Sequence, residues 1–188
     1  MPVHFPGATL RLGGALTGLL IVTYVLSYPV LPDRGALLGS PGWHPLIAFP
    51  HGAKILIAWM MGWASVAVVL PVAILMKLVM QDGHLTRADA VVSVLGALAG
   101  PVAFDLFLWA GFDLRRNGGH RVRWQGITLV GLVASVLKLF GACLLMQFCG
   151  MQAATPVEQL SFLAADTAGL ILLMLLLMLA FRFRRGTD

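Results

Sequence analysis

Three charged residues interrupt long apolar stretches of the chain and are the first candidates for chemistry. They are Asp105, Lys138 and Asp166, and each is flanked by apolar or small residues. Removing a charge from water costs free energy unless a partner or a ligand compensates for it. We therefore treat all three as candidate ligand-binding residues, and Lys138 and Asp166 also as a candidate ion pair.

A second group of candidates lies in the sequence PHGAK at 50–54, which opens a very apolar stretch. Pro50 suits the first turn of a helix, and Gly52 allows a close approach of another backbone or of a ligand. His51 and Lys54 share one helix face beside the positive end of the helix dipole, which favours anions. A site for a phosphate, a carboxylate or a lipid head group is one interpretation. The other is interfacial anchoring, in which Lys54 extends to lipid head groups.

Other chemistry is not expected from the sequence. The five histidines fall in predicted connections or at the edges of apolar stretches, so a haem held between two helices is not predicted: His4, His44, His51, His84 and His120. The metalloprotease HExxH, the GxSxG and the Walker A patterns do not occur. We predict no catalytic residue, no cofactor, no metal and no enzyme activity.

Composition identifies the environment of these residues. The chain is 59% hydrophobic and 11% charged, and its mean hydropathy is +0.89. A soluble domain carries about a quarter charged residues, so this surface must face lipid. Transmembrane β-barrels show short alternating segments, which are absent, whereas long apolar runs suit helices. We predict an all-α polytopic transmembrane bundle. The net charge of +5 comes from residues near span ends, so nucleic acid is not a predicted partner.

Five spans are predicted within a single integral membrane domain, 1–188. They cover about 12–31, 52–80, 89–112, 125–149 and 159–181. The second is longer than a bilayer requires and contains Pro71, where we expect a tilt or a kink. The segment 36–50 is apolar but short and cut by three prolines, which favours a re-entrant or interfacial segment. If it crossed the membrane, the number of crossings would be six.

The distribution of basic residues predicts orientation in the cell inner membrane. With five spans the two ends lie on opposite sides, and the side of the C-terminus holds nine Lys and Arg residues against three. Cytoplasmic segments carry the excess of Lys and Arg. We therefore predict an external N-terminus and a cytoplasmic C-terminus.

Depth in the membrane predicts which charges meet. At about 1.5 Å per residue, Lys138 and Asp166 lie about 20 and 22 Å from the cytoplasmic ends of their spans. These spans are joined by a short connection, so we expect them to be antiparallel neighbours and to form a Lys138–Asp166 ion pair. Asp105 lies about 10 Å deep, and its expected partner is Lys54. Such pairs either fix helix register or form a ligand or ion site.

Small residues spaced four apart predict close helix packing. The clearest examples are Gly14 with Gly18 and Gly96 with Gly100. Intramolecular bundling is one use of these faces, and a homodimer is the alternative.

Parts of the chain resemble a known family. The sequences PHGAKILIAWMMGW, PVAFDLFLWAGFDL and WQGITLVGLVASVL resemble the bacterial membrane-associated sensor domains (MASE-type) that are fused to histidine kinases and diguanylate cyclases. The resemblance covers about 45–140, and Pro50, Gly52, Gly62 and Trp63 match the family's pattern. Those domains usually have more spans and a cytoplasmic output domain, whereas this chain stops shortly after its last span. The resemblance therefore implies a unit that acts through a separate protein.

The predicted function is accordingly non-catalytic. We expect a sensory, ligand-binding or scaffold unit that contacts membrane lipids and a membrane or cytoplasmic protein partner. The alternative is a small-solute transporter or its membrane substrate-binding subunit, which the chain resembles in size and span number.

Overall fold

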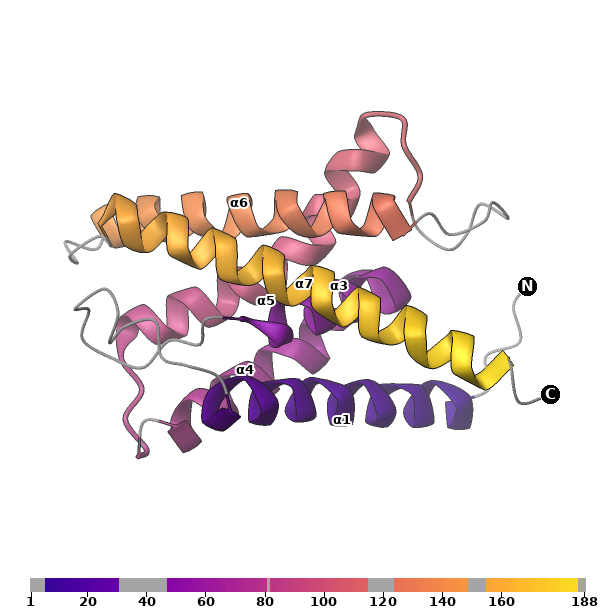
Figure 1. The fold of residues 1–188 in the computed structure, drawn as a ribbon. Coiled ribbons are helices and arrows are strands. Elements are labelled where there is room, and N and C mark those ends of the chain that lie inside the picture. The colour runs from indigo at the N-terminus through magenta and orange to yellow at the C-terminus, as the bar shows by residue number, and fades with distance from the viewer. Residues whose placement is uncertain (1–5, 31–46, 81, 115–123, 149–154, 186–188) are drawn as a thin grey trace.

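The described part of the chain is helical, as predicted. A computed structural model describes residues 6–30, 47–80, 82–114, 124–148 and 155–185. The helices are α1 (Pro6–Val30), α3 (Phe49–Met61), the short 3₁₀ helix η1 (Gly62–Ala64), α4 (Ser65–Met80), α5 (Arg87–Trp109), α6 (Trp124–Phe148) and α7 (Pro156–Arg185). Figure 1 shows them packed side by side as a bundle. The prediction of an all-α bundle is confirmed.

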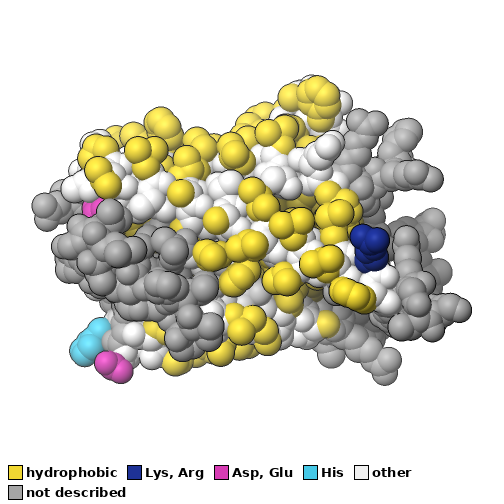
Figure 2. Space-filling model, viewed as in Figure 1, with side chains coloured by type: hydrophobic (Ala, Val, Ile, Leu, Met, Phe, Trp, Pro, Cys, Tyr) yellow, Lys and Arg dark blue, Asp and Glu magenta, His cyan; other side chains and the backbone are white. Residues whose placement is uncertain are grey.

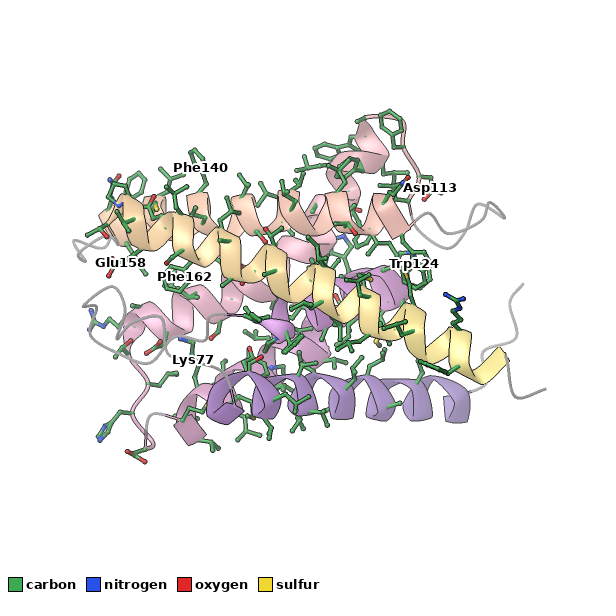
Figure 3. All side chains as sticks on the ribbon, viewed as in Figure 1. Lys77, Asp113, Trp124, Phe140, Glu158 and Phe162 are labelled. Carbon is green, nitrogen blue, oxygen red and sulfur yellow. The ribbon has the colours of Figure 1, made fainter. Side chains whose placement is uncertain are left out.

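The outer surface of the bundle is apolar. Hydrophobic side chains are spread over the face of the molecule shown in Figure 2. Phe140, which points outward from α6 in Figure 3, is 67% exposed, and Leu176 on α7 is 54% exposed. Four stretches have a mean hydropathy of at least 2.0 and are long enough to cross a bilayer. Water-soluble proteins do not expose apolar surfaces of this extent, so the chain is an integral membrane protein.

Two of the helices begin at reciprocal side-chain caps. At α5 the Thr86 hydroxyl accepts a hydrogen bond from the Asp89 backbone N–H, and the Asp89 carboxylate accepts one from the Thr86 N–H. Thr155 and Glu158 make the same exchange at the start of α7. Each cap satisfies N–H groups that a helix start leaves without partners. The caps therefore mark where the polar connections end and the apolar helices begin.

The stretch predicted as one span over 52–80 is two helices that run in opposite directions. The first, α3, runs parallel to α5. Lys54 of α3 lies opposite Gly96 of α5, where an added Cβ would be 3.5 Å from the lysine Nζ. One turn further along both helices, Ala58 lies opposite Gly100, with 2.9 Å between the corresponding Cβ positions.

The second helix, α4, runs antiparallel to α5. Near its start the Trp63 indole N–H donates to the Asp105 carboxylate, at 2.7 Å. Near its end Lys77 forms an ion pair with Asp89, at the beginning of α5. The chain therefore reverses between α3 and α4.

The reversal occurs at Gly62 and not at Pro71, so the prediction of one kinked span is wrong. Gly62 has φ +58°, ψ −133°, a conformation that side-chain-bearing residues rarely adopt. Pro71 lies inside α4, which continues past it. The reversal brings the beginning of α1 and the end of α7 to the same end of the bundle (Figure 1). The predicted external N-terminus rested on an odd number of spans, and the reversal removes that basis.

The other four predicted spans correspond to α1, α5, α6 and α7, with ends that differ by a few residues. Most of the predicted re-entrant segment 36–50 lies outside the described residues, and its last two residues begin α3.

Glycines permit close contacts between several of these helices. An added Cβ at Gly52 would lie 3.0 Å from the backbone Cα of Leu170 on α7. The predicted pair of Gly96 and Gly100 faces α3, as described above. By contrast, an added Cβ at Gly14 or at Gly18 would meet no described atom within 4 Å. The α5 glycines therefore serve packing within the chain.

Candidate functional site

The first turn of α3 is fixed against the interior of α7. The Ala48 backbone N–H donates to the Ala165 carbonyl at 3.0 Å. The Ala48 carbonyl oxygen lies 2.2 Å from where a Cβ of residue 169 would be, so only a glycine fits at that position of α7. Because α3 has 13 residues, it spans about 20 Å and covers part of the bundle's length. It begins inside the bundle and not at its end.

His51 is consequently a residue of the bundle interior. Its side chain is buried, and Nε2 lies 3.1 Å from the Gly131 carbonyl oxygen and 2.9 Å from Ser135 Oγ. Both partners belong to the central part of α6. The predicted span over 52–80 would begin at the membrane surface beside His51, whereas the structure places His51 in the bundle interior. The reason for this difference is that the sequence was interpreted as a helix that starts at the membrane surface.

Asp166 connects α7 to this histidine and to α6. Its carboxylate forms an ion pair with the Lys138 ammonium, and Oδ2 lies 3.8 Å from His51 Nδ1. Asp166 is 5% exposed. The predicted Lys138–Asp166 ion pair is confirmed, and its neighbour His51 was not anticipated.

Ser135, His51 and Asp166 lie in the order found in serine hydrolases, but the geometry does not favour nucleophilic chemistry. The separation of 3.8 Å between His51 and Asp166 exceeds a hydrogen bond. The Ser135 hydroxyl is also 3.1 Å from the carbonyl of Gly131, one turn earlier, which is a common contact of helical serines. We interpret these three side chains as a polar network that links α3, α6 and α7.

Lys54 occupies the same region without a carboxylate of its own. Its Nζ lies 5.4 Å from the centre of the Tyr24 ring, a cation–π contact with α1. In the described part of the chain no carboxylate lies within ion-pair distance of Lys54. Both Lys54 Nζ and Lys138 Cδ are within 4 Å of the position that a Cβ of Gly96 would take. The two lysines therefore meet at one point of α5.

The predicted pairing of Asp105 with Lys54 is wrong. Asp105 receives the Trp63 indole hydrogen bond, and it follows Gly96, the residue opposite Lys54, by nine positions on α5. Nine residues correspond to about 13 Å along a helix. Asp105 therefore does not belong to the cluster formed by His51, Lys54, Lys138 and Asp166.

A cavity of about 150 Å³ adjoins the ion pair. It lies between α5, α6 and α7, and it includes Phe162 from the first half of α7 (Figure 3). Its polar wall consists of Ser135, Lys138, Gln159 and Asp166. Its other lining residues are apolar or weakly polar: Val92, Leu139, Ala142, Cys143, Met146, Phe162 and Leu163.

One further buried polar group of this region is the hydroxyl of Ser93 on α5. Ser93 is 3% exposed, and its hydroxyl has no hydrogen-bond partner among the described residues. It lies three positions before Gly96, on the same face of α5. A buried hydroxyl without a partner costs free energy, which a bound ligand would offset.

The cluster thus contains two lysines and one carboxylate. With the imidazole counted as neutral at pH 7, as in the formal charge of the chain, the described cluster carries a charge of +1. An anion would balance this formal charge. No three His, Cys, Asp or Glu side chains within the described segments come together in a way that would hold a metal ion.

Sequence reasoning found four of these residues but not their neighbours. Ser135 could have been found, because it stands three residues before Lys138 on the same helix face. Tyr24, Ser93 and Gly96 carry no comparable signal, because they belong to other helices and meet the cluster only through packing.

The chain matches no protein-family model, no curated protein and no solved structure. The resemblance to membrane-associated sensor domains stays a prediction.

Proposed function

We propose that this integral membrane protein binds a small anionic ligand inside its helix bundle, and that it acts as a sensory or ligand-binding unit through a separate protein partner. The observation that carries the proposal is Lys54. It lies beside the Lys138–Asp166 pair, and no described carboxylate oxygen is within ion-pair distance of its ammonium group.

The energetics of the membrane interior support this proposal. A charged side chain within a bilayer costs about 3 kcal/mol even on the most permissive scale. The Lys138–Asp166 pair compensates for two charges, and the Tyr24 ring contributes about 0.5–2 kcal/mol toward the third. A bound anion would compensate for the remainder. A purely structural clamp requires one lysine and one carboxylate, so it accounts for Lys138 and Asp166 but not for Lys54.

The position of α3 supports the same ligand chemistry. Helices that begin within a membrane protein direct the positive ends of their dipoles at anionic groups. The α3 start carries His51 and Lys54 in its first turns and is fixed inside the bundle by Ala165.

The second candidate function is transport of such an anion. Interrupted helices and central binding sites are typical of secondary transporters, and α3 with its reversal at Gly62 is an interrupted element of this kind. Flux of the bound anion into proteoliposomes would distinguish a transporter from a sensor.

We further propose that both ends of the chain are cytoplasmic and that the protein resides in the bacterial inner membrane. Arg11 lies near the start of α1 and Arg182, Arg184 and Arg185 lie in the last turns of α7, and these two helix ends meet at one end of the bundle in Figure 1. The start of α6 lies at this end too, because Trp124 lines a groove together with Met178 of α7. Four further arginines precede α6 in the sequence: Arg115, Arg116, Arg121 and Arg123. Lys77 and Arg87 lie at the opposite end, where α4 ends and α5 begins, and Arg34 follows α1 in the sequence. The positive-inside rule then favours a cytoplasmic location for both ends. This arrangement replaces the predicted external N-terminus.

The partners that we propose are lipids and protein. A shallow groove of about 780 Å³ runs between α6 and α7, and it is lined mainly by apolar residues such as Leu132 and Met174. In a bilayer, acyl chains would lie along it. A homodimer through the open face at Gly14 and Gly18, or a kinase or cyclase partner as the sensor-domain resemblance implies, would transmit the response.

Ligand binding can be tested on the purified protein in phosphatidylcholine nanodiscs. We expect small carboxylates or inorganic phosphate to raise the melting temperature, and Lys54→Met to abolish this shift. The matched control is Lys77→Met, which removes a lysine paired with Asp89 at the bundle end and should leave the shift intact. A Lys54→Met protein that responds like the wild type would refute the site.

A further inference from the structure

We infer that the ligand is a short-chain monocarboxylate, with its carboxylate between Lys138 and Lys54 and its hydrocarbon tail in the cavity between α5, α6 and α7. This inference rests on the proposed function and specifies the ligand class. Three features of the site support it: the charge of the cluster, the size of the cavity and the division of the cavity wall into a polar and an apolar part.

The charge of the cluster sets the charge of the ligand. Counted by formal charge, Lys54 and Lys138 together exceed Asp166 by one positive charge. A monoanion brings the sum to zero, whereas a dianion leaves one uncompensated negative charge in a region of low dielectric constant. An uncompensated charge there is expensive. The site should therefore prefer one carboxylate to two.

The second lysine offsets the repulsion that this carboxylate would meet from Asp166. A carboxylate that met Lys138 alone would also face the Asp166 carboxylate, which is repulsive. Lys54 supplies the second positive charge, because both lysines reach the surface of α5 at Gly96. The Ser93 hydroxyl, one turn away on the same face, is a donor without a partner among the described residues.

The cavity sets the size and polarity of the rest of the ligand. Its volume of about 150 Å³ corresponds to roughly five water molecules at about 30 Å³ each, which suits a molecule of about five or six non-hydrogen atoms. Apart from Ser135, Lys138, Gln159 and Asp166, the wall consists of apolar or weakly polar side chains such as Leu139, Met146 and Phe162. Such a wall favours a methyl or methylene group over a polar one.

Isothermal titration of the wild-type protein in phosphatidylcholine nanodiscs tests the inference without any substitution. The probes are the series acetate, butyrate, octanoate and decanoate, together with succinate, 1-butanol and butylamine. We expect butyrate to bind at least about ten-fold more tightly than succinate, 1-butanol or butylamine, since a tenfold change corresponds to about 1.4 kcal/mol. We also expect affinity to fall from butyrate to decanoate, because the cavity is too small for longer chains.

A variant that narrows the apolar part of the cavity adds a test of position. Ala142 lines the cavity, so Ala142→Leu should lower the affinity for butyrate by about ten-fold or more and change that for acetate less. The control Ala164→Leu alters an exposed position of α7 and should leave both affinities unchanged. If Ala142→Leu does not fold, the chain-length series with the wild-type protein still tests whether the cavity limits the size of the ligand.

The outcomes separate this inference from the proposed function. The assignment of a short-chain monocarboxylate fails if succinate binds as tightly as butyrate, or if decanoate binds more tightly than butyrate. In either case the proposed anion site is retained. The second result would indicate a membrane-derived fatty acid. If none of the anions, inorganic phosphate included, binds to the wild-type protein, the proposed function fails and the inference fails with it.

Discussion

Removal of Asp166 should destabilise the protein more than removal of Lys138. When one partner of a buried ion pair is removed, the charge left behind costs about 3–5 kcal/mol. Asp166→Leu leaves Lys138 without its partner and removes the carboxylate nearest to Lys54, so we expect a loss of about 5 kcal/mol. Lys138→Met leaves Asp166 with His51 at 3.8 Å and with Lys54 in the same cluster, so we expect about 3 kcal/mol.

The double variant Lys138→Met with Asp166→Leu measures the coupling between the two side chains. It leaves neither member of the pair alone, so its loss of stability should be smaller than the sum of the two single losses by about 2–3 kcal/mol. The free energy of unfolding is measured by reversible titration from dodecylmaltoside into sodium dodecyl sulfate, followed by far-UV circular dichroism.

The ion pair of Lys77 with Asp89 is the matched control. Its side chains are 24% and 14% exposed, against 19% and 7% for Lys138 and Asp166. The Lys77–Asp89 pair lies at the bundle end beside the exposed residues 82–87. Because solvent-exposed pairs contribute about 0–1 kcal/mol, the same double-mutant cycle there should give a small coupling. Additive losses at Lys138 and Asp166, within about 0.5 kcal/mol, would refute the reasoning. So would a larger loss for Lys138→Met than for Asp166→Leu.

Two further predictions concern packing and topology. Gly169→Ala places a Cβ 2.2 Å from the Ala48 carbonyl oxygen and should destabilise the protein by about 1–3 kcal/mol or more. The control Gly14→Ala has no described atom within 4 Å of the new Cβ and should be neutral or stabilising by up to about 1 kcal/mol. Equal melting temperatures for the two variants would contradict the close contact inferred at Gly169. Topology is tested with Val3→Cys and, separately, Thr187→Cys in a chain without its native cysteines. Both variants should resist labelling by a membrane-impermeant maleimide in intact spheroplasts. Labelling of one alone would place the two ends of the chain on opposite sides of the membrane.

The helical bundle was predictable because it follows from composition. Long apolar runs in a chain with 11% charged residues leave few alternatives to transmembrane helices. The Lys138–Asp166 pair was also predictable, because both residues lie inside their helices at similar depth and a short connection makes the helices neighbours.

The rest of the site could not be predicted, because its geometry depends on the reversal of the chain between α3 and α4, which has little sequence signal. The turn between α3 and α4 is apolar, and Gly62, its only residue that favours a turn, is one of 21 glycines in the chain. Pro71 gave a more obvious reason for a break, but the helix continues through it. With α3 and α4 joined as one span, Lys54 was placed at the wrong depth and was paired with Asp105.

The contact between Ala48 and α7 has a mechanical consequence. The α3 start is joined to α7 by the Ala48–Ala165 hydrogen bond and by the fit at Gly169, so a shift or tilt of α7 carries α3 with it. Asp166 would move in the same direction as Lys54, while Lys138 stays with α6. A force that separates Lys138 from Asp166 would therefore move α3 and α7 together against α6.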